Sequence, residues 1–584
     1  MGGALLAVAA LLASGPLLGD YDRSILVQGM LFAVAAVTVD ILWGYTGVLS
    51  YAQSVFFGLG AYGLAIYSVE FGFSWTGAVI AIVLSAVAAC VVALLLGLLS
   101  FHSKADWLYV ATVTFAATFA FEKVILAGGS LTGSSSGLSG FVLQPVGIAD
   151  GYRLSGLLLI AVTLGACLLV RSDAGRVMRA IRENEGRSQY LGIRVHRVKI
   201  LLFAVAACVA AIAGSLYATT QNVVAPDLGG FQLGTAMVIW AAVGGRGTLL
   251  GPVGAAIGIN HLNAYLSGSI PFLWQLVLGL VFVLVVTYAP GGAASLIGFP
   301  IRWLQSKLRV PGGSMPGGLL TVVPHMKAHE ASARTTRPLL EVTDVSRSFG
   351  SFHAVKAVAL AADGGEIVSI VGPNGAGKST FMRCISDGGY RTSGSVRVAG
   401  SDIGRLTPDV ISRLGVGQKF QTASVFASLS VFECLSVATR ARRPSIWRRT
   451  SQLEIPAPAF EIIQMTGLDR LLHHTVSGLS HGQKQSLELA MVMCTEPRVI
   501  LLDEPTAGLS QTERAAIGAV LRKIATDHLA LLILVEHDLD FVQEISSRVL
   551  VLHHGELLMD GTVSEVVSSE LVQEIYTGSP AGME

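Results

Sequence analysis

The second half of the chain carries a glycine-rich stretch whose residue types and spacing suit phosphate binding. The stretch GPNGAGKST (372–380) follows an apolar, β-branched run and precedes residues that favour a helix. Glycines at this spacing let backbone N–H groups and a helix N-terminus surround phosphates, and the lysine reaches the outer ones. We therefore predict a nucleoside triphosphate site in which Ser379 also binds Mg²⁺. The residues expected to contact the nucleotide are Gly372, Pro373, Asn374, Gly375, Ala376, Gly377, Lys378, Ser379 and Thr380.

Four further side chains suit the hydrolysis of that nucleotide, and three of them lie at the ends of apolar runs. In RVILLDEP (498–505) we expect Asp503 to hold Mg²⁺ through water and Glu504 to act as general base on the attacking water. His537 ends another apolar run and is expected to hold this water and Glu504 in line with the γ-phosphate. Gln421 precedes both runs and is expected to sense Mg²⁺ or the water. The predicted catalytic residues are Glu504, His537 and Gln421, and the predicted Mg²⁺ ligands are Ser379, Gln421 and Asp503.

The stretch LSHGQ (479–483) has the composition of a helix start directed at an anion. We expect Ser480, Gly482 and Gln483 to contact a γ-phosphate. The glycine loop of the same subunit already encloses its own nucleotide, so the stretch is predicted to complete the site of a second subunit. ATP would then hold two subunits together until it is hydrolysed. Phe349, upstream of the glycine loop, is expected to stack on adenine, with ordinary packing as the alternative.

The elements that position these residues must lie in a folded domain that follows a very apolar first half. The chain has 584 residues with a mean hydropathy of +0.63, and its charges are concentrated after about residue 339. We predict an all-helical membrane domain of about ten spans over 1–300, a flexible Gly- and Pro-rich linker over 301–338 and an α/β P-loop domain over 339–584. The candidate spans lie near 3–19, 26–43, 52–69, 76–100, 107–127, 154–170, 198–218, 233–243, 248–267 and 271–290.

Charge and cysteine patterns orient the chain and exclude some functions. The loop 171–199 is the most basic connection of the first half, so it is predicted to face the cytoplasm and to dock a short helix on the ATPase domain. A solvated basic loop is the alternative. A net charge of +1 disfavours nucleic-acid binding, and six cysteines without CxxC spacing indicate neither a disulfide framework nor a zinc site.

Small and hydroxyl-bearing residues gather in two stretches of the first half. In 43–63 they favour either close packing of membrane helices or an interrupted helix that a small polar solute passes. The second stretch, 131–141, is expected to contact an external partner. Asp40 and Glu122 lie near the ends of predicted spans, where we expect them at the membrane interface.

The ordered set GPNGAGKST, Gln421, LSHGQ, LLDEP and His537 resembles the ATP-binding cassette (ABC) ATPases over 339–584. Members most often have LSGGQ, so His481 departs at the middle position. Residues 26–300 resemble permeases of the branched-chain amino acid importer group, notably in GYTGVLSYAQSVFFGLGAY, GRVMRAIRENEGRSQYLGIRVHRVKILLF, AGSLYA and GGRGTLLGPVGA. The stretches VIWAAVGGRGTL, GQKFQTASVFASLSVFE and LSHGQKQSLELAM are more similar to the urea and short-amide branch, whereas SYAQS departs from the usual sequence.

This resemblance implies a fused permease–ATPase subunit of an ABC importer in the bacterial plasma (inner) membrane, with the ATPase domain in the cytoplasm. It implies ATP and Mg²⁺ as cofactors. It also implies a second permease, a second ABC ATPase and an external solute-binding protein as partners, besides membrane lipid and without nucleic acid. The expected solute is urea, a short amide or a branched-chain amino acid. An ABC exporter and a membrane-anchored regulatory ATPase without transport are the alternatives.

Overall fold

The chain forms two compact units, and one of them contains a segment from the other half of the sequence. The computed structural model describes residues 8, 18–101, 107–141, 147–269, 274–288, 291–292, 319–323, 338–440, 445–446, 448–569 and 572. The first unit consists of Met1–Met178 and His196–Ser314, and the second of Arg179–Val195 and Met315–Glu584. Arg179–Val195 lies between two membrane helices in sequence, yet it belongs to the ATPase unit.

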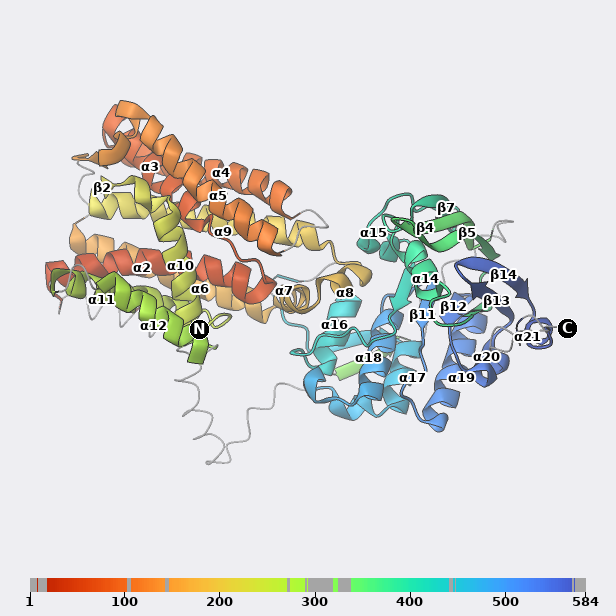
Figure 1. Cartoon of the computed structure of the whole chain (residues 1–584). Helices are drawn as coiled ribbons and strands as arrows, with labels where there is room; N and C mark the ends of the chain where they lie inside the picture. The colour runs from red at the N-terminus through yellow and green to blue at the C-terminus, as the bar shows by residue number, and fades with distance from the viewer. Residues whose placement is uncertain are drawn as a thin grey trace. The chain divides into compact units, whose positions relative to one another are not determined.

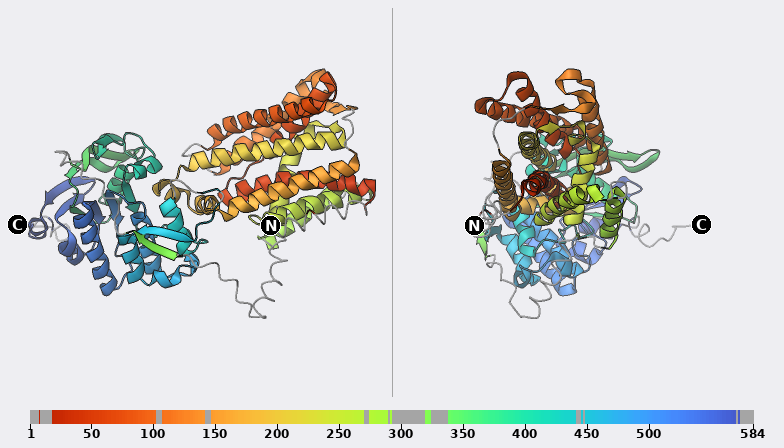
Figure 2. Two further views of the ribbon diagram at one scale, coloured as in Figure 1. Left: turned by 180° about the vertical axis from the view of Figure 1, so that it is seen from behind. Right: turned by 90° about the vertical axis from the view of Figure 1, so that its left-hand side faces the viewer.

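Long apolar helices that run side by side make up the first unit (Figure 1, Figure 2). They are α2 (Asp20–Asp40), α3 (Gln53–Phe71), α4 (Trp75–Ser100), α5 (Trp107–Ala127), α6 (Ile148–Arg171), α9 (Val195–Gln221), α10 (Phe231–Gly244), α11 (Leu250–Ser269) and α12 (Trp274–Tyr288). A two-residue strand pair, β1 (Leu138–Ser139) with β2 (Val223–Val224), joins two of the connections.

Within the described residues, six helices are long and apolar enough to cross a membrane, fewer than the ten spans that we predicted. These six are α2 with its π-helical extension, α3, α4, α5, α6 and α9. The last three predicted stretches form α10, α11 and α12, and α10 is a shorter apolar helix. The first predicted span, 3–19, lies almost entirely outside the described residues.

Helix α4 shows how a membrane-facing helix is built. Small residues recur on its buried side at helical spacing: Ala78, Ala81, Ser85, Ala89, Ala93 and Gly97. Large apolar side chains are exposed on its other side: Val79, Ile80, Val83, Leu84, Val87, Val91, Leu94, Leu95, Leu98 and Leu99. Close packing inward and apolar exposure outward is the pattern expected of a helix whose outer face contacts lipid.

The stretch 43–63 shows both close helix packing and an interrupted helix, the two alternatives that its sequence offered. Helix α2 continues as a π-helix (Ile41–Tyr45), residues 47–52 are not helical, and α3 then begins at Gln53. The glycines of α3 serve packing, since a Cβ added at Gly60 would overlap the carbonyl of Ala211 on α9. The small residues therefore allow helix contact next to an interrupted helix.

Asp40 is buried within the protein, and its expected place at the membrane interface stays a prediction. Its side chain is fully buried within the first unit and accepts hydrogen bonds from the backbone N–H groups of Gly247 (2.6 Å) and Leu249 (2.9 Å). The carboxylate is needed there because the turn between α10 and α11 leaves these N–H groups without helical partners. Asp40 thus holds that turn against the end of α2.

Two sheets and the helices around them form the ATPase unit (Figure 1). The six-stranded sheet has the order β14 (Glu556–Gly561), β13 (Arg548–His553), β6 (Ile367–Val371), β12 (Leu531–Val535), β11 (Val499–Asp503), β9 (Val416–Lys419). The antiparallel four-stranded sheet has the order β5 (Phe352–Ala362), β4 (Leu340–Phe349), β7 (Ser393–Val398), β8 (Ser401–Asp402). The main core lies between the two sheets around α14 (Lys378–Ser386).

Parallel pairing within the larger sheet brings the predicted chemistry to one edge. Strands β9, β11, β12 and β6 are parallel neighbours, with Asp503 opposite Val535 and Leu502 opposite Lys419. The loops that follow these strands therefore start from the same edge. The remaining helices are α15 (Pro408–Arg413), α16 (Val431–Arg440), α17 (Ala457–Met465), α18 (His481–Met493), α19 (Gln511–His528), α20 (Leu539–Ile545) and α21 (Val563–Val567).

Part of the predicted flexible linker has regular structure. Strand β3 (Leu319–Val323) pairs in parallel with β10 (Gln452–Pro456), which lies in the ATPase unit. The prediction of an unstructured tether over 301–338 is therefore wrong for these five residues, whose apolar and β-branched composition suits a strand. Residues 301–318 and 324–337 lie outside the described part of the chain.

Candidate nucleotide-binding site

The glycine loop connects a fully buried strand to a helix, as its motif requires. Strand β6 is buried throughout, and α14 begins at Lys378. Gly375 (φ 83°) and Gly377 (φ 100°) adopt left-handed backbone conformations that other residues rarely take. A Cβ at Gly377 would also overlap the carbonyl of Ala354. The loop can therefore keep its N–H groups exposed to a phosphate only with glycine at these positions.

Lys378 is folded back over its own loop. Its Nζ donates to the carbonyls of Gly372 (2.6 Å) and Pro373 (3.0 Å). Burial lowers the pKa of this lysine, and the nearby carboxylates of Asp503 and Glu504 oppose that shift. Phosphate oxygens are stronger acceptors than carbonyls for an ammonium group, so the side chain has a reason to exchange partners when a nucleotide binds.

Asp503 ends β11 as a carboxylate with a free oxygen. The residue is 7% exposed, and its Oδ1 is buried without a hydrogen-bond partner among the described residues. Burial raises its pKa, whereas a hydrogen bond from Ser379 lowers it. A hydroxyl beside an incompletely satisfied carboxylate offers the oxygen ligands that Mg²⁺ prefers. Ser379 and Asp503 therefore fit the predicted metal-binding role, and this role stays a prediction.

The three predicted catalytic side chains meet at one oxygen. Gln421 Nε2 donates to Glu504 Oε1 (3.0 Å), and His537 Nε2 lies 3.3 Å from the same oxygen. Glu504 has a left-handed backbone (φ 47°), an uncommon conformation for a side chain of this size. Its N–H bonds to the carbonyl of Val535 (2.9 Å). The structure thus gathers these residues from three strand ends, while their catalytic roles stay predictions.

Sequence reasoning missed a lysine that holds this corner of the site. Lys419 is fully buried, and its Nζ donates to the backbone carbonyls of Phe420 (3.1 Å), Asp503 (3.3 Å) and Glu504 (3.3 Å). The signal available in the sequence was a lysine at the end of a run with strand character, VGQKF, where a charge is costly unless it is paired.

The LSHGQ stretch starts α18 with a capping box. The Ser480 Oγ accepts from Gln483 N (3.2 Å), and the Gln483 side chain accepts from Ser480 N (3.1 Å). This reciprocal pair fixes the first turn. The ring of His481 lies against Gly508. The helix start is therefore fixed by its cap, and the contact of Ser480, Gly482 and Gln483 with a second subunit's nucleotide stays a prediction.

Phe349 is partly covered by its own neighbours. The residue is 45% exposed, the Arg347 guanidinium lies 4.3 Å from its ring centroid, and the Tyr390 ring meets it edge-on at 6.1 Å. Both alternatives considered for Phe349 keep support, because the ring packs on one side and remains accessible to a planar base. Adenine stacking stays a prediction.

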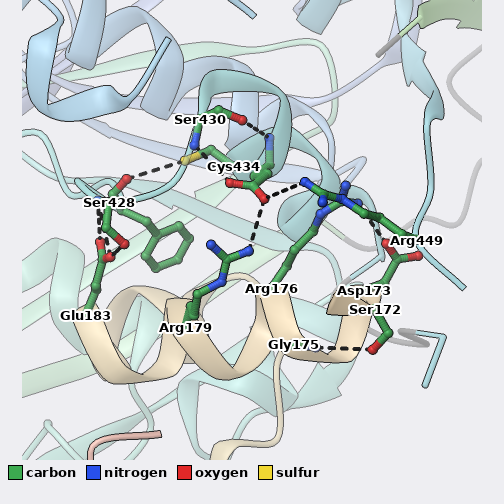
Figure 3. Close-up of polar contacts among 12 residues, drawn as sticks. Ser172, Asp173, Gly175, Arg176, Arg179, Glu183, Ser428, Ser430, Cys434 and Arg449 are labelled. Atoms are coloured by element: carbon green, nitrogen blue, oxygen red, sulfur yellow. Dashed lines mark hydrogen bonds and ion pairs between the residues drawn. The ribbon is translucent and has the colours of Figure 1, made fainter. Parts of the chain in front are cut away.

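The segment Arg179–Val195 is embedded among the elements of the ATPase unit. It contains the end of α7 (Asp173–Glu183) and all of α8 (Glu185–Tyr190). Arg179 pairs with Glu433 (3.0 Å), and the carboxylate of Glu183 accepts hydrogen bonds from Ser428, as Figure 3 shows for the residues it labels. Asn184 donates to Ser424 (3.0 Å). The expected docked helix is therefore present, and a solvated loop is excluded for this segment.

Both halves of the chain match known protein families. Residues 23–286 match the model described as branched-chain amino acid transport system / permease component, and residues 355–507 match the ABC transporter model. The chain is 32% identical over 254 residues to the high-affinity branched-chain amino acid transport ATP-binding protein BraF of Pseudomonas aeruginosa, covering 42% of this chain and 99% of that protein. It is 32% identical over 257 residues to LivG of Escherichia coli strain K12, with the same coverage.

Among solved structures, an ATP-binding cassette of an ABC transporter in its ADP conformation is 26% identical, with a TM-score of 0.36, covering 42% of this chain and 100% of that one. From the family matches, the second half is an ATP-binding and ATP-hydrolysing domain, and the apolar helices of the first half make this a multi-pass membrane protein. The chain belongs to the ABC transporter family, in which it joins a permease of the branched-chain amino acid transport type to an ATPase in one polypeptide.

Proposed function

We propose that this chain is one permease–ATPase subunit of an importer in the bacterial plasma (inner) membrane, with its ATPase domain in the cytoplasm. One observation carries the proposal: the segment Arg179–Val195, which connects the apolar helices α6 and α9, belongs to the ATPase unit. The loop between α6 and α9, which we propose to lie in the cytoplasm, is thereby part of the ATPase fold. Changes at the nucleotide site thus have a covalent route to the membrane helices.

The geometry of the site supports hydrolysis of ATP by water. Lys378 and the glycine loop would hold the β- and γ-phosphates, and Glu504 would accept the proton of the attacking water. Gln421 and His537, which both lie at Glu504 Oε1, would keep that water in line. Mg²⁺, held by Ser379, Asp503 and Gln421, would supply neutralisation of the phosphate charge. The water oxygen bonds to the γ-phosphorus as the bond to ADP breaks.

The motif at the start of α18 implies that the chain works with a second ATPase. Ser480, Gly482 and Gln483 would close over a nucleotide bound by that partner, so ATP would draw the two ATPases together and its hydrolysis would release them. The resemblance to branched-chain amino acid importers also implies a second permease and an external solute-binding protein, which we include in the proposal. The relatives BraF and LivG are named for branched-chain amino acid transport, and the resemblance of three stretches favours urea or a short amide. We propose a small polar solute of these classes.

A reconstituted transport assay tests this function. The full-length chain and its co-purified partner subunits would be placed in vesicles with ATP inside and the binding protein with radiolabelled urea, acetamide or leucine outside. We expect ATP-dependent uptake of one of these solutes, and no uptake when Glu504→Gln replaces the wild-type chain. ATP-driven movement in the outward direction would overturn the proposal in favour of an exporter. Hydrolysis without movement of any solute would favour a regulatory ATPase.

A further inference from the structure

The segment Arg179–Val195 places a charged side chain deep inside the ATPase unit. The side chain of Arg187, on α8, is 1% exposed. Its Nη1 donates to the carbonyl of Gln418 (2.8 Å) and lies 3.3 Å from Glu488 Oε1. Its Nη2 donates to the carbonyl of Glu488 (3.3 Å). One guanidinium therefore joins α8 to both the end of β9 and the helix α18.

Glu488 also contacts the segment that leads to the predicted hydrolytic residues. The oxygen that faces Arg187, Oε1, also accepts from the backbone N–H of Phe420 (3.2 Å). One turn earlier on α18, Gln485 Nε2 donates to the carbonyl of Gln421 (2.8 Å). Gln421 in turn donates to Glu504. A continuous series of bonded groups thus runs from α8 to the predicted general base.

A second buried charge closes the series from the other side. Lys419 lies between Gln418 and Phe420 in sequence and donates to the carbonyls of Asp503 and Glu504. The charge of Glu488 lies near both Arg187 and Lys419 and interacts with each of them. Arg187, Glu488 and Lys419 therefore all bond to the backbone of 418–420, next to Gln421, and Lys419 also holds the strained backbone of Glu504.

Stability alone gives no reason for this arrangement. Arg187 Nε and Glu488 Oε2 are buried without a hydrogen-bond partner among the described residues. A buried ion pair with unsatisfied atoms contributes little net stability, and apolar side chains of similar volume often serve equally well. What the charges do accomplish is directional: Arg187, Glu488 and Lys419 each bond to at least one backbone group of 418–420 or 503–504.

We propose that Arg187, Glu488 and Lys419 form a positioning relay that sets Gln421 and Glu504 according to the placement of α8. None of the three touches the reacting atoms, so they are positioning residues. The relay would make hydrolysis respond to movement of the permease loop. It deepens the proposed transport function and rests on it, but its effect on ATP hydrolysis is measured separately.

Steady-state ATP hydrolysis by the full-length chain with its partner subunits, in lipid nanodiscs, tests the relay. Arg187→Met removes the links to Gln418 and Glu488, while Lys419 still balances the charge of Glu488. We expect kcat to fall about tenfold, or about 1.4 kcal/mol of activation free energy, with KM for ATP within about twofold, because the glycine loop is untouched. The matched control is Arg179→Met, which breaks an ion pair of the same segment with Glu433 but no bond toward Gln421.

A second set of variants separates positioning from folding. Glu488→Gln leaves the buried Arg187 without the carboxylate that faces it, so we expect a lower thermal unfolding temperature as well as slow hydrolysis. The double variant Arg187→Met/Glu488→Gln also removes the Arg187 cation, which Glu488 balances in the wild-type chain. It should recover the unfolding temperature while its kcat stays as low as that of Arg187→Met. Arg187→Lys keeps the charge but not the planar two-carbonyl contact, and we expect about a threefold loss of kcat.

Two results would overturn the relay. One is a kcat within about twofold of wild type for both Arg187→Met and Arg187→Lys. The other is an equal loss for Arg179→Met, which would show that docking of the segment as a whole is what matters. Failure of the transport proposal looks different: the wild-type complex would hydrolyse ATP, with the variant pattern intact, but would import no solute.

Discussion

Replacing the Glu504 carboxylate by an amide (Glu504→Gln) removes the proposed general base and nearly preserves the shape of the side chain. In the structure, Gln421 Nε2 and His537 Nε2 both approach Oε1, at 3.0 and 3.3 Å. An amide oxygen at that position would still accept from them. The side chain is 20% exposed, so its loss of charge leaves no buried ion uncompensated. We expect folding stability to change by less than about 1 kcal/mol.

The effect on turnover is expected to be far larger. A general base contributes about 10²–10⁴-fold to a rate, which corresponds to about 2.7–5.4 kcal/mol. Because both neighbours of Glu504 lie at Oε1, the other carboxylate oxygen is left for the water. We therefore expect a loss of about 10³-fold in kcat, in the middle of that range. ATP binding rests on the glycine loop and should be unchanged.

The assay measures two quantities. One is the steady-state rate of ATP hydrolysis, and the other is ATP-dependent association of the ATPase domains, which size-exclusion chromatography of the full complex monitors. We expect the variant to remain associated in ATP and the wild type to dissociate as ATP is consumed. The matched control is Glu513→Gln, another hydrogen-bonded glutamate, which accepts from Ser510 at the start of α19. A kcat for Glu504→Gln within about threefold of wild type would refute the assignment of Glu504 as the base.

Three further substitutions test the architecture. Asp40→Asn turns an amide NH₂ toward the N–H of Gly247 or Leu249, so we expect a loss of about 1–3 kcal/mol, seen as a lower unfolding temperature in detergent. Gly60→Ala would force the α3 and α9 backbones apart, at about 1–3 kcal/mol, measured as reduced yield and a lower unfolding temperature. Ser480→Ala removes the α18 cap, at about 1 kcal/mol, and should also weaken ATP-dependent association in the same chromatography.

The parts of the molecule that local sequence determines could be predicted. The strand, loop and helix around Lys378 are contiguous, and each apolar run ends in a side chain with a predicted catalytic or metal-binding role. Parallel pairing of those runs then brings Asp503, Glu504 and His537 together. Hydropathy likewise located the long membrane helices, because each of them is a continuous run of about twenty mostly apolar residues.

What escaped prediction depends on contacts between distant segments. Arg187 and Glu488 are separated by 301 positions, and neither stands out among the charges around it in sequence. The buried position of Asp40 follows from a turn that packs on α2 from residues more than two hundred positions away. The LLTVV stretch has strand composition, but its partner, β10, lies far along the chain and pairs with it only once both are folded.

The pairing of β3 with β10 bears on how this fusion relates to transporters made of separate chains. A cut at residue 338, where the linker was predicted to end, would strip β10 of its only paired strand in the described structure and leave an open edge prone to intermolecular pairing. A free-standing ATPase fragment should therefore start ahead of Leu319. Even then it would lack Arg187, and Glu488 would lose the partner that the permease half of the gene encodes. The boundary between the two halves of this protein therefore does not fall at one position in the sequence. If the chain were cut into a permease and an ATPase polypeptide, the two would have to reassociate to restore these contacts.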